Sequence, residues 1–217
     1  MTLSGMPIYL IIIGITVLVS LLAFRDRGVY LKTIFYPWQM AREKEWHRFI
    51  SHGFIHADYL HLGVNMYSLY LFGGIVEEMF RLHFGNGKGI FYFLILYFFG
   101  IILSSFPSFE KHRNNPAYSA VGASGAVSAV AFSFILLFPT QKLSFIFLPF
   151  LQIPGFVLGI AYLVYSWYMA KRSSDHIAHD AHFWGAAFGV VFTSLIDYRF
   201  LIRFWVEISS YFTNLLS

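Results

Sequence analysis

Long stretches without a single charged residue dominate this sequence. Residues 1–24 carry no charge, and five more uncharged stretches follow, of 16 to 28 residues, at 59–76, 89–109, 114–141, 143–170 and 181–196. Only 12% of the 217 residues are charged, against about a quarter in a typical soluble domain. A soluble chain of this length could not hide 58% hydrophobic residues from water. We therefore expect an integral membrane protein.

We predict one membrane helix in each uncharged stretch, six in all, although the sixth, with 16 residues, is slightly shorter than the usual length of about 17–25. Pro139 ends the fourth helix, and Pro149, Pro154 and Gly155 divide the fifth stretch, so we expect a loop there and a helix from about Pro154. The predicted helices cover residues 7–24, 59–76, 89–109, 124–138, 154–170 and 181–196. The fold class is an all-α, polytopic membrane bundle in one domain over residues 1–217, with helix 1 in 1–24 and helices 2–6 in 60–196.

Two segments combine aromatic rings with charges, which is typical of chain lying at a membrane interface. The first is a loop over residues 25–59, expected to be half-embedded beside the bundle. The second is a C-terminal tail over residues 197–217, where Arg199, Arg203 and Glu207 recur four apart on one face of an amphipathic helix. We expect both segments to contact membrane lipids without crossing the bilayer.

Charge and cysteine content exclude several classes of function. The net charge is +4, but no basic face is clustered as nucleic-acid binding requires, so no nucleic-acid partner is expected. The chain has no cysteine, which excludes disulfides, thiolate catalysis and cysteine-based metal sites. The first apolar stretch lacks a basic leader and a small-residue cleavage site, so we interpret it as a retained helix.

Polar residues inside the predicted helices are costly and therefore informative. His61 and Asn65 share one face of helix 2, Ser124 opens helix 4, and His182 opens helix 6. Even-numbered helices run in the same direction, so these starts lie at one membrane face. Asn65 is then only roughly 10 Å below that face. The four side chains can converge in a shallow site that water reaches.

Such a set can perform acyl transfer. A serine hydroxyl becomes a nucleophile when a neutral imidazole takes its proton, so Ser124 and His182 form a candidate dyad. The free N–H groups at a helix start, together with donors from His61 and Asn65, suit a developing oxyanion. Gly122 and Gly125 permit a tight turn around the serine.

Each of these residues also has a structural interpretation. Small residues are common wherever membrane helices pack closely, so Ser124 taken alone, and Gly185 and Gly189 in any case, fit helix packing. Asn65 could make an interhelical hydrogen bond. The two histidines before helix 2, His52 and His56, could hydrogen-bond loop carbonyls. All of these residues together indicate a catalytic site more specifically than any one of them does.

Four motifs together resemble the rhomboid family. The run from Arg48 to Met66 resembles its signature entering helix 2 and contains His52, His56, His61 and Asn65. Three further motifs resemble those of the same family. They are the Gly-Gly-x-x-Glu that ends at Glu77, the Gly122–Gly125 nucleophile motif and the histidine motif over residues 181–189. The resemblance covers all six predicted helices in order.

The resemblance implies an intramembrane serine endopeptidase that needs no cofactor and no metal. Ser124 would be the nucleophile, His182 the general base, and His61 and Asn65 oxyanion donors. Gly122, Gly125, His52, His56, Glu77, Gly185 and Gly189 would support them. Its substrates would be transmembrane proteins cut near helix ends, with helix 5 and residues 171–180 as gate and cap. A bacterial inner membrane is the expected location, with the site facing outward.

Two positions depart from the family pattern. Many members carry a tyrosine one helical turn after the nucleophile, stacked on the catalytic histidine, but here that position is Ser128. Another group must then orient His182. The first-loop Trp-Arg pair is interrupted as Trp46-His47-Arg48, which leaves the local geometry of that loop open.

Three other functions compete with this one. A catalytically silent rhomboid-like binder of membrane helices is possible, although such relatives generally lose the serine or the histidine. A metal protein could use His52 with His56, or the run of His176, His179 and His182, but the chain has no His-Glu-x-x-His. A transporter would need polar groups along a whole path, whereas here they gather near one face. The sequence does not indicate an oligomeric state.

Overall fold

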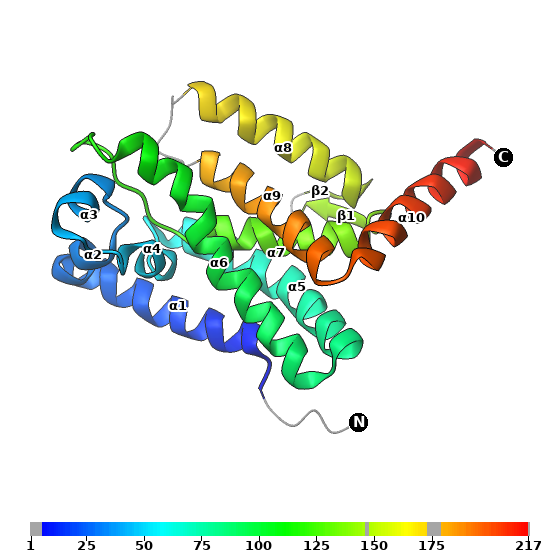
Figure 1. The fold of residues 1–217 in the computed structure, drawn as a ribbon, viewed down its shortest axis with the longest axis horizontal. Coiled ribbons are helices and arrows are strands. Elements are labelled where there is room, and N and C mark those ends of the chain that lie inside the picture. The colour runs from blue at the N-terminus through cyan, green and yellow to red at the C-terminus, as the bar shows by residue number, and fades with distance from the viewer. Residues whose placement is uncertain (1–5, 146–147, 173–178, 217) are drawn as a thin grey trace.

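Six long helices occupy the stretches predicted from the sequence, and the all-α fold class is confirmed (Figure 1). The computed structural model describes residues 6–145, 148–172 and 179–216. The six helices are α1 (Ile8–Arg25), α5 (Tyr59–Phe84), α6 (Asn86–His112), α7 (Ser124–Leu137), α8 (Gly155–Arg172) and α9 (His179–Ile196). Their ends lie within about three residues of the prediction, except that α5 continues to Phe84. Charged residues bound the stretches of α1 and α6, and Pro139 and Pro154 mark the end of α7 and the start of α8.

Helix α7 is the centre of the bundle. Eleven of its 14 residues are buried, and it packs against α5, α6 and α9. At 1.5 Å per residue it is only about 21 Å long, shorter than a bilayer core of about 30 Å. Because neighbouring helices enclose it, it can begin and end within the protein. Its first residue, Ser124, therefore lies inside the bundle.

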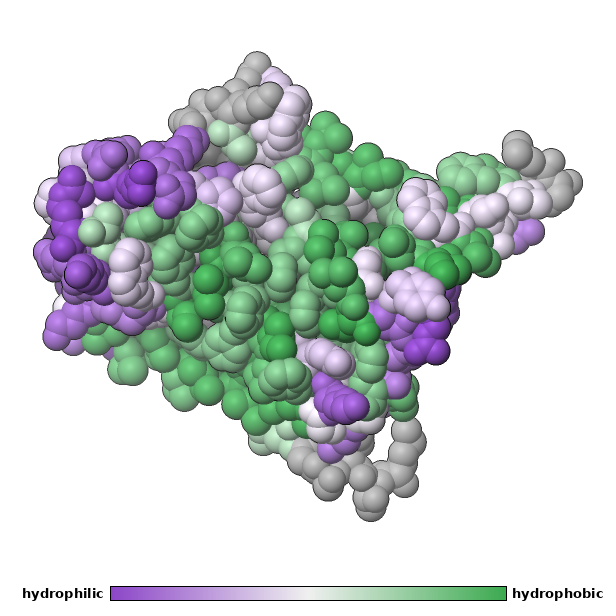
Figure 2. Space-filling view, viewed as in Figure 1, coloured by the Kyte–Doolittle hydropathy of each residue, from purple (hydrophilic) through white to green (hydrophobic). Residues whose placement is uncertain are grey.

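An apolar surface surrounds the bundle between two polar ends. Figure 2 shows hydrophobic residues over its middle and hydrophilic residues at the end formed by α2 and α3, with another group at the opposite end. Among the described helices, α1 and α6 are each long and apolar enough to cross a membrane alone. Helix α9 with the following α10 makes a third span if this pair, bent by 111°, is counted as one. The other helices are shorter or carry charges.

Glu77 holds the start of α1 against α5. Its carboxylate is 2% exposed and accepts hydrogen bonds from the backbone N–H groups of Ile8 (2.9 Å) and Tyr9 (2.8 Å). The same carboxylate forms an ion pair with Arg81, one turn further along α5. A negative charge at a helix N-terminus satisfies its free N–H groups and complements the helix dipole. Glu77 therefore fixes the packing of two helices.

The first loop folds into short helices, and the side chain of Arg48 binds two carbonyl groups near the end of the first of them. These helices are α2 (Arg27–Thr33), α3 (Pro37–Glu43), α4 (Arg48–Ser51) and the 3₁₀ turn η1 (His52–Phe54). Arg48 is 3% exposed and donates to the carbonyl oxygens of Leu31 (2.7 Å) and Ile34 (2.9 Å) and to the carboxylate of Glu45 (2.6 Å). Trp46 is half-exposed, with its ring 5.7 Å from that of Phe109. Arg48 thus fastens the loop although His47 separates it from Trp46.

The prediction of a loop before the fifth helix is wrong, because a β-hairpin forms in this segment. Strands β1 (Lys142–Phe145) and β2 (Leu148–Pro154) pair antiparallel, with Lys142 opposite Pro154 and Leu143 opposite Ile153. Both strands are edges, where a proline deprives no further strand of a hydrogen bond. Prolines that break helices are therefore compatible with this hairpin, which joins α7 to α8.

The C-terminal tail forms α10 (Tyr198–Leu216), which turns away from α9 by 111°. Arg203 and Glu207 form an ion pair at 2.7 Å along one face, as their spacing predicts. Phe200, from the other face, is buried in the core. Asp197, which lies between the two helices, links the start of α10 to α5, because its carboxylate accepts from Arg199 and contacts His83 of α5 at 2.7 Å. A sharp bend of this size suits a helix lying along the membrane surface.

Candidate active site

Ser124 begins α7, at a point where backbone N–H groups have no partner within the helix. The first backbone bond of α7 runs from the N–H of Val127 to the carbonyl of Ala123 at 2.9 Å. The N–H groups of residues 124–126 precede this pattern. Ala123 is the N-cap residue and makes no side-chain cap. The Ser124 hydroxyl is therefore not used to cap the helix, and the N–H groups of the first turn of α7 have no partner within that helix.

The segment before Ser124 is held by the first loop. Phe35 and Ala120 form an isolated antiparallel bridge, with N–H to carbonyl distances of 3.0 and 2.9 Å. Two residues later, Gly122 donates its N–H to the carbonyl of His52 at 3.0 Å. These are strand-like contacts between parts of the chain about 70 to 85 residues apart. The first loop therefore sets the position of the turn that presents Ser124.

Gly122 is required by both its backbone angle and its surroundings. Its φ is +117°, a region that side chains rarely adopt. A Cβ there would lie 2.7 Å from Cε1 and 2.8 Å from Nε2 of His61. The imidazole of His61 therefore packs directly against the turn, beside the residues that lead to Ser124. The ring of His56 stands edge-on to that of His61, at 4.9 Å between centroids.

His56 links helix α1 to the same turn. The Ser20 hydroxyl donates to the carbonyl of Phe54 (3.0 Å), so its oxygen is left to accept from Nδ1–H of His56 (3.0 Å). That tautomer leaves Nε2 as an acceptor, and the N–H of Ala123 lies 3.4 Å from it, a long hydrogen bond. His56 is fully buried, and it can perform this role only in its neutral form.

Acidification should weaken the fold through these first-loop histidines. Burial, and secondarily the nearby His61, lower the pKa of His56 to about 3, and burial lowers that of His52 to about 4. Each folded pKa lies below the ordinary 6.5, so the unfolded chain binds protons that the folded chain does not. Stability is therefore lost as the pH falls below 6.5. At pH 5 the loss should be about 2 kcal/mol for each histidine.

We expect His56→Gln to reduce the drop in unfolding free energy between pH 7 and pH 5 by about 2 kcal/mol. Thermal unfolding in detergent at both pH values measures this change. His47→Gln, which replaces an exposed histidine of the same loop, is the matched control. Equal drops in all three proteins would contradict this account of His56.

Helices α7 and α9 touch through their backbones, in parallel. A Cβ on Gly185 would overlap the carbonyl oxygen of Gly125, and one on Gly189 would overlap that of Ala129. Steps of four on both helices show that they run in the same direction in register. His182 precedes Gly185 by three residues on the same face of α9, and Ser124 is adjacent to Gly125. This contact therefore brings the two helix starts, with Ser124 and His182, to the same end of the pair.

The ring beside His182 comes from α8. The rings of Tyr162 and His182 stack with centroids 6.2 Å apart and planes 19° apart. The Tyr162 hydroxyl lies 2.7 Å from the hydroxyl of Ser128, the residue one turn after Ser124. The sequence left open which group would orient His182. No periodicity or motif marks Tyr162, because its role depends on how α8 packs.

Two of the predicted site residues lie at very different depths on α5. Asn65 is 5% exposed, and its Nδ2 donates to the carbonyl of His61 at 2.9 Å, which leaves its second amide hydrogen available. Glu77 lies 16 residues beyond His61, about 24 Å along the helix. The proposed supporting role of Glu77 is therefore confined to the packing of α1 and α5, and it does not reach Ser124.

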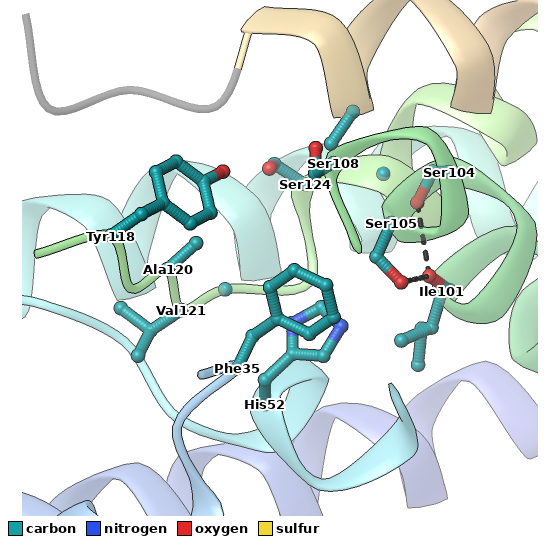
Figure 3. Close-up of a pocket in the computed structure, with 13 residues that line it drawn as sticks. Phe35, His52, Ile101, Ser104, Ser105, Ser108, Tyr118, Ala120, Val121 and Ser124 are labelled. Atoms are coloured by element: carbon teal, nitrogen blue, oxygen red, sulfur yellow. Dashed lines mark hydrogen bonds between the residues drawn. The ribbon is translucent and has the colours of Figure 1, made fainter. Parts of the chain in front are cut away.

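A small cavity adjoins Ser124, as Figure 3 shows. Its volume is about 20 Å³, enough for one water molecule. Hydroxyl groups of α6 (Ser104, Ser105 and Ser108) share its lining with His52, Tyr118 and Ser124. In Figure 3 the Tyr118 hydroxyl points toward Ser108 and Ser124. Ser108 also donates to the carboxylate of Asp180 at 2.6 Å, which ties α6 to the start of α9.

A histidine-based metal site is not found within the described part of the chain. No group of three or more His, Asp or Glu side chains lies close enough there to hold an ion. His176, which the metal hypothesis uses, lies outside the described residues, and so do most of the expected cap residues, 173–178.

Comparison with known proteins gives one family. Residues 43–199 match the Rhomboid domain family. The chain is 30% identical over 169 residues to Presenilin-associated rhomboid-like protein A, mitochondrial, from Danio rerio, covering 71% of this chain and 40% of that protein. It is 32% identical over 127 residues to Rhomboid protease GlpG from Haemophilus influenzae, covering 57% of this chain and 58% of that protein.

A third relative is RHOMBOID-like protein 12, mitochondrial, from Arabidopsis thaliana, 28% identical over 152 residues, with 67% of this chain and 45% of that protein covered. The chain spans about half the length of the curated relatives it matches. The matched region begins within the first loop and ends just after α9, so it contains the turn around Ser124 and both histidine motifs. This chain belongs to the rhomboid family of multi-pass integral membrane proteins.

Proposed function

We propose that this protein is an intramembrane serine endopeptidase acting through a Ser124–His182 dyad. The observation that carries the proposal is the direct backbone contact between α7 and α9, which joins the two helix starts that bear these residues. The free N–H groups at the start of α7, the His61 ring against Gly122 and a water-sized cavity lined in part by Ser124 support it. The family includes a protein named as a protease, which agrees with this chemistry.

In the first step, the Ser124 hydroxyl attacks the carbonyl carbon of the scissile peptide bond while His182 takes its proton. The carbonyl oxygen becomes an oxyanion. Collapse of the tetrahedral intermediate breaks the C–N bond, and His182 passes the proton to the departing amine. The products of this step are an acyl ester on Ser124 and a shortened helix with a new amino terminus.

In the second step, water attacks the acyl ester, and His182 takes a proton from it. The ester C–O bond breaks, the proton returns to the Ser124 oxygen, and the new carboxyl group leaves. A bilayer interior holds little water, so a site for this reaction needs its own supply. The cavity beside Ser124, lined by serine hydroxyls, can hold one water molecule.

The oxyanion would be held by the Ser124 amide, the His61 ring and Asn65. Removing one oxyanion donor typically costs about 10²–10³-fold in kcat. We therefore expect Asn65→Ala to lower kcat by about this factor while KM stays nearly constant, because the lost interaction exists mainly in the transition state. Steady-state cleavage of a labelled transmembrane peptide in liposomes measures both constants.

Val64→Ala is the matched control, because Val64 is adjacent on α5 and is 57% exposed. It should cleave like the wild type. If Asn65→Ala loses less than about tenfold, Asn65 is not an oxyanion donor, and its hydrogen bond to the His61 carbonyl is its main role.

The substrates would be transmembrane proteins cut near the ends of their helices. Helix α8 would act as a lateral gate, since its outer face, with Ile160 and Val164, is exposed and apolar as a lipid-facing surface requires. We place the protein in a bacterial inner membrane with the site facing outward. The relative from Haemophilus influenzae supports a bacterial setting.

A fluorophosphonate probe tests the proposal directly, because it reacts with an activated serine whatever the substrate is. Purified protein in liposomes should be labelled covalently on Ser124, and an added chelator should change neither labelling nor cleavage of a transmembrane peptide. Failure of the probe to label folded protein would favour a silent binder of membrane helices. Loss of activity with the chelator would instead favour a metal mechanism.

A further inference from the structure

We propose that Tyr162 of α8 is the positioning residue for the His182 imidazole. This inference rests on the proposed function, because it concerns how the general base is held. The ring of Tyr162 stacks nearly parallel to that of His182, with centroids 6.2 Å apart and planes 19° apart. Offset stacking of this kind restricts rotation of an imidazole about its own side-chain bonds.

Tyr162 is itself fixed from a second helix. Its hydroxyl lies 2.7 Å from the Ser128 hydroxyl on α7, and its ring is 5.6 Å from that of Phe132, one turn further along α7. Ser128 thus contacts the hydroxyl of Tyr162, Phe132 packs against its ring, and the face of that ring stacks on His182. Side chains from α7, α8 and α9 meet in this one assembly.

The small side chain at position 128 is part of the same arrangement. Ser128 is one helical turn after Ser124 on α7 and is 5% exposed. A larger side chain there would occupy the space that the Tyr162 hydroxyl fills. Serine leaves that space and offers a hydroxyl that bonds it. The residue at 128 and the tyrosine at 162 are therefore complementary.

Positioning matters because proton transfer needs the imidazole nitrogen within hydrogen-bond reach of the serine hydroxyl. A displacement of about 1 Å at a catalytic group can cost about 10²-fold in rate. Since the ring belongs to α8, any movement of α8 away from α9 also withdraws it from His182. The helix that forms the outer wall of the site thus also sets the orientation of its base.

The test compares variants of the full-length protein in liposomes by two readouts. The first is the rate of labelling by a fluorophosphonate, a small probe that does not need a transmembrane helix to enter the bundle. The second is kcat and KM for a labelled transmembrane peptide. Tyr162→Leu should lower the labelling rate and kcat by about 10- to 100-fold, with KM within about threefold. Tyr165→Leu, on the same helix and 55% exposed, should match the wild type in both readouts.

A rescue variant separates positioning from general loss of structure. Adding Ser128→Tyr to Tyr162→Leu supplies a ring from α7 in place of the one from α8. The double variant should be labelled at least about tenfold faster than Tyr162→Leu alone. A defect in packing alone would be made worse by this larger side chain. Absence of any recovery, or a Tyr162→Leu protein labelled as fast as the wild type, would overturn the inference.

If Tyr162→Leu does not fold, two milder substitutions test the same inference. Tyr162→Phe and Ser128→Ala each remove one side of the same hydroxyl contact, so their losses of a few-fold should not add in the double variant. Additive losses would show that the two residues act independently and would overturn the inference. A wild-type protein that no fluorophosphonate labels would remove the proposed function, and this inference with it. If the probe labels the wild type and labels the Tyr162 variants equally fast, this inference is wrong and the proposed function stands.

Discussion

Ser124→Ala should abolish cleavage of a transmembrane peptide, with a loss in kcat of at least about 10⁴-fold. Serine supplies the atom that forms the acyl ester, and alanine offers no substitute. The nucleophile and its base act as a unit, so His182→Ala should be comparably severe, and the double variant should be little worse than either single one. Cleavage by the purified variants in liposomes, measured over long incubations, checks each of these expectations.

The same substitution should leave the fold intact. Ala123 occupies the N-cap position of α7 and the Ser124 hydroxyl does not cap the helix, so its removal deprives the helix of no capping hydrogen bond. Thermal unfolding of Ser124→Ala should match the wild type. Ser194→Ala is the matched control, because this serine of α9 bonds to the carbonyl of Val190 in its own helix (2.8 Å). A fully active Ser124→Ala protein would remove Ser124 from the mechanism.

The positions of the membrane helices were predictable because charged residues are costly in the apolar layer of a membrane, which leaves long apolar stretches in the sequence. Charged residues bound the apolar stretches of α1 and α6, so the ends of these helices could be placed within about three residues. Helix α7 lies inside a longer uncharged stretch, and its end was placed from Pro139. The hairpin of β1 and β2 was not predictable on these grounds. Its strands are short, and its prolines also fit a loop or a helix start.

Within the site, the helix starts and the glycine contacts were predictable, and the cross-links between helices were not. The spacing of Gly185 and Gly189 indicates a close helix contact whatever the partner is. By contrast, Tyr162 meets His182 and Glu77 meets the start of α1 only because separate helices pack in a particular rotation. No local pattern in the sequence encodes that rotation. These contacts therefore became visible only in the folded chain.

Gly189→Ala should cost the protein about 3 kcal/mol of stability, a large effect for a single methyl group. A Cβ at Gly189 would overlap the carbonyl oxygen of Ala129, an atom of the α7 backbone that no side-chain rotation can move aside. The helices would have to separate, and the buried contacts along α7 would loosen with them. The shift in the unfolding midpoint, by heat or by an SDS titration of the purified protein, measures this loss.

Gly14→Ala supplies the control that isolates the contact from the intrinsic effect of glycine. Apart from the neighbouring backbone of α1 itself, no atom of the described residues lies within 4 Å of a Cβ at Gly14, so alanine there should be neutral or stabilise by up to about 1 kcal/mol through helix propensity. Gly189→Ala gains the same propensity and should still be destabilised. If both variants were equally stable, α7 and α9 would not be in backbone contact. The dyad that depends on their contact would then need another basis.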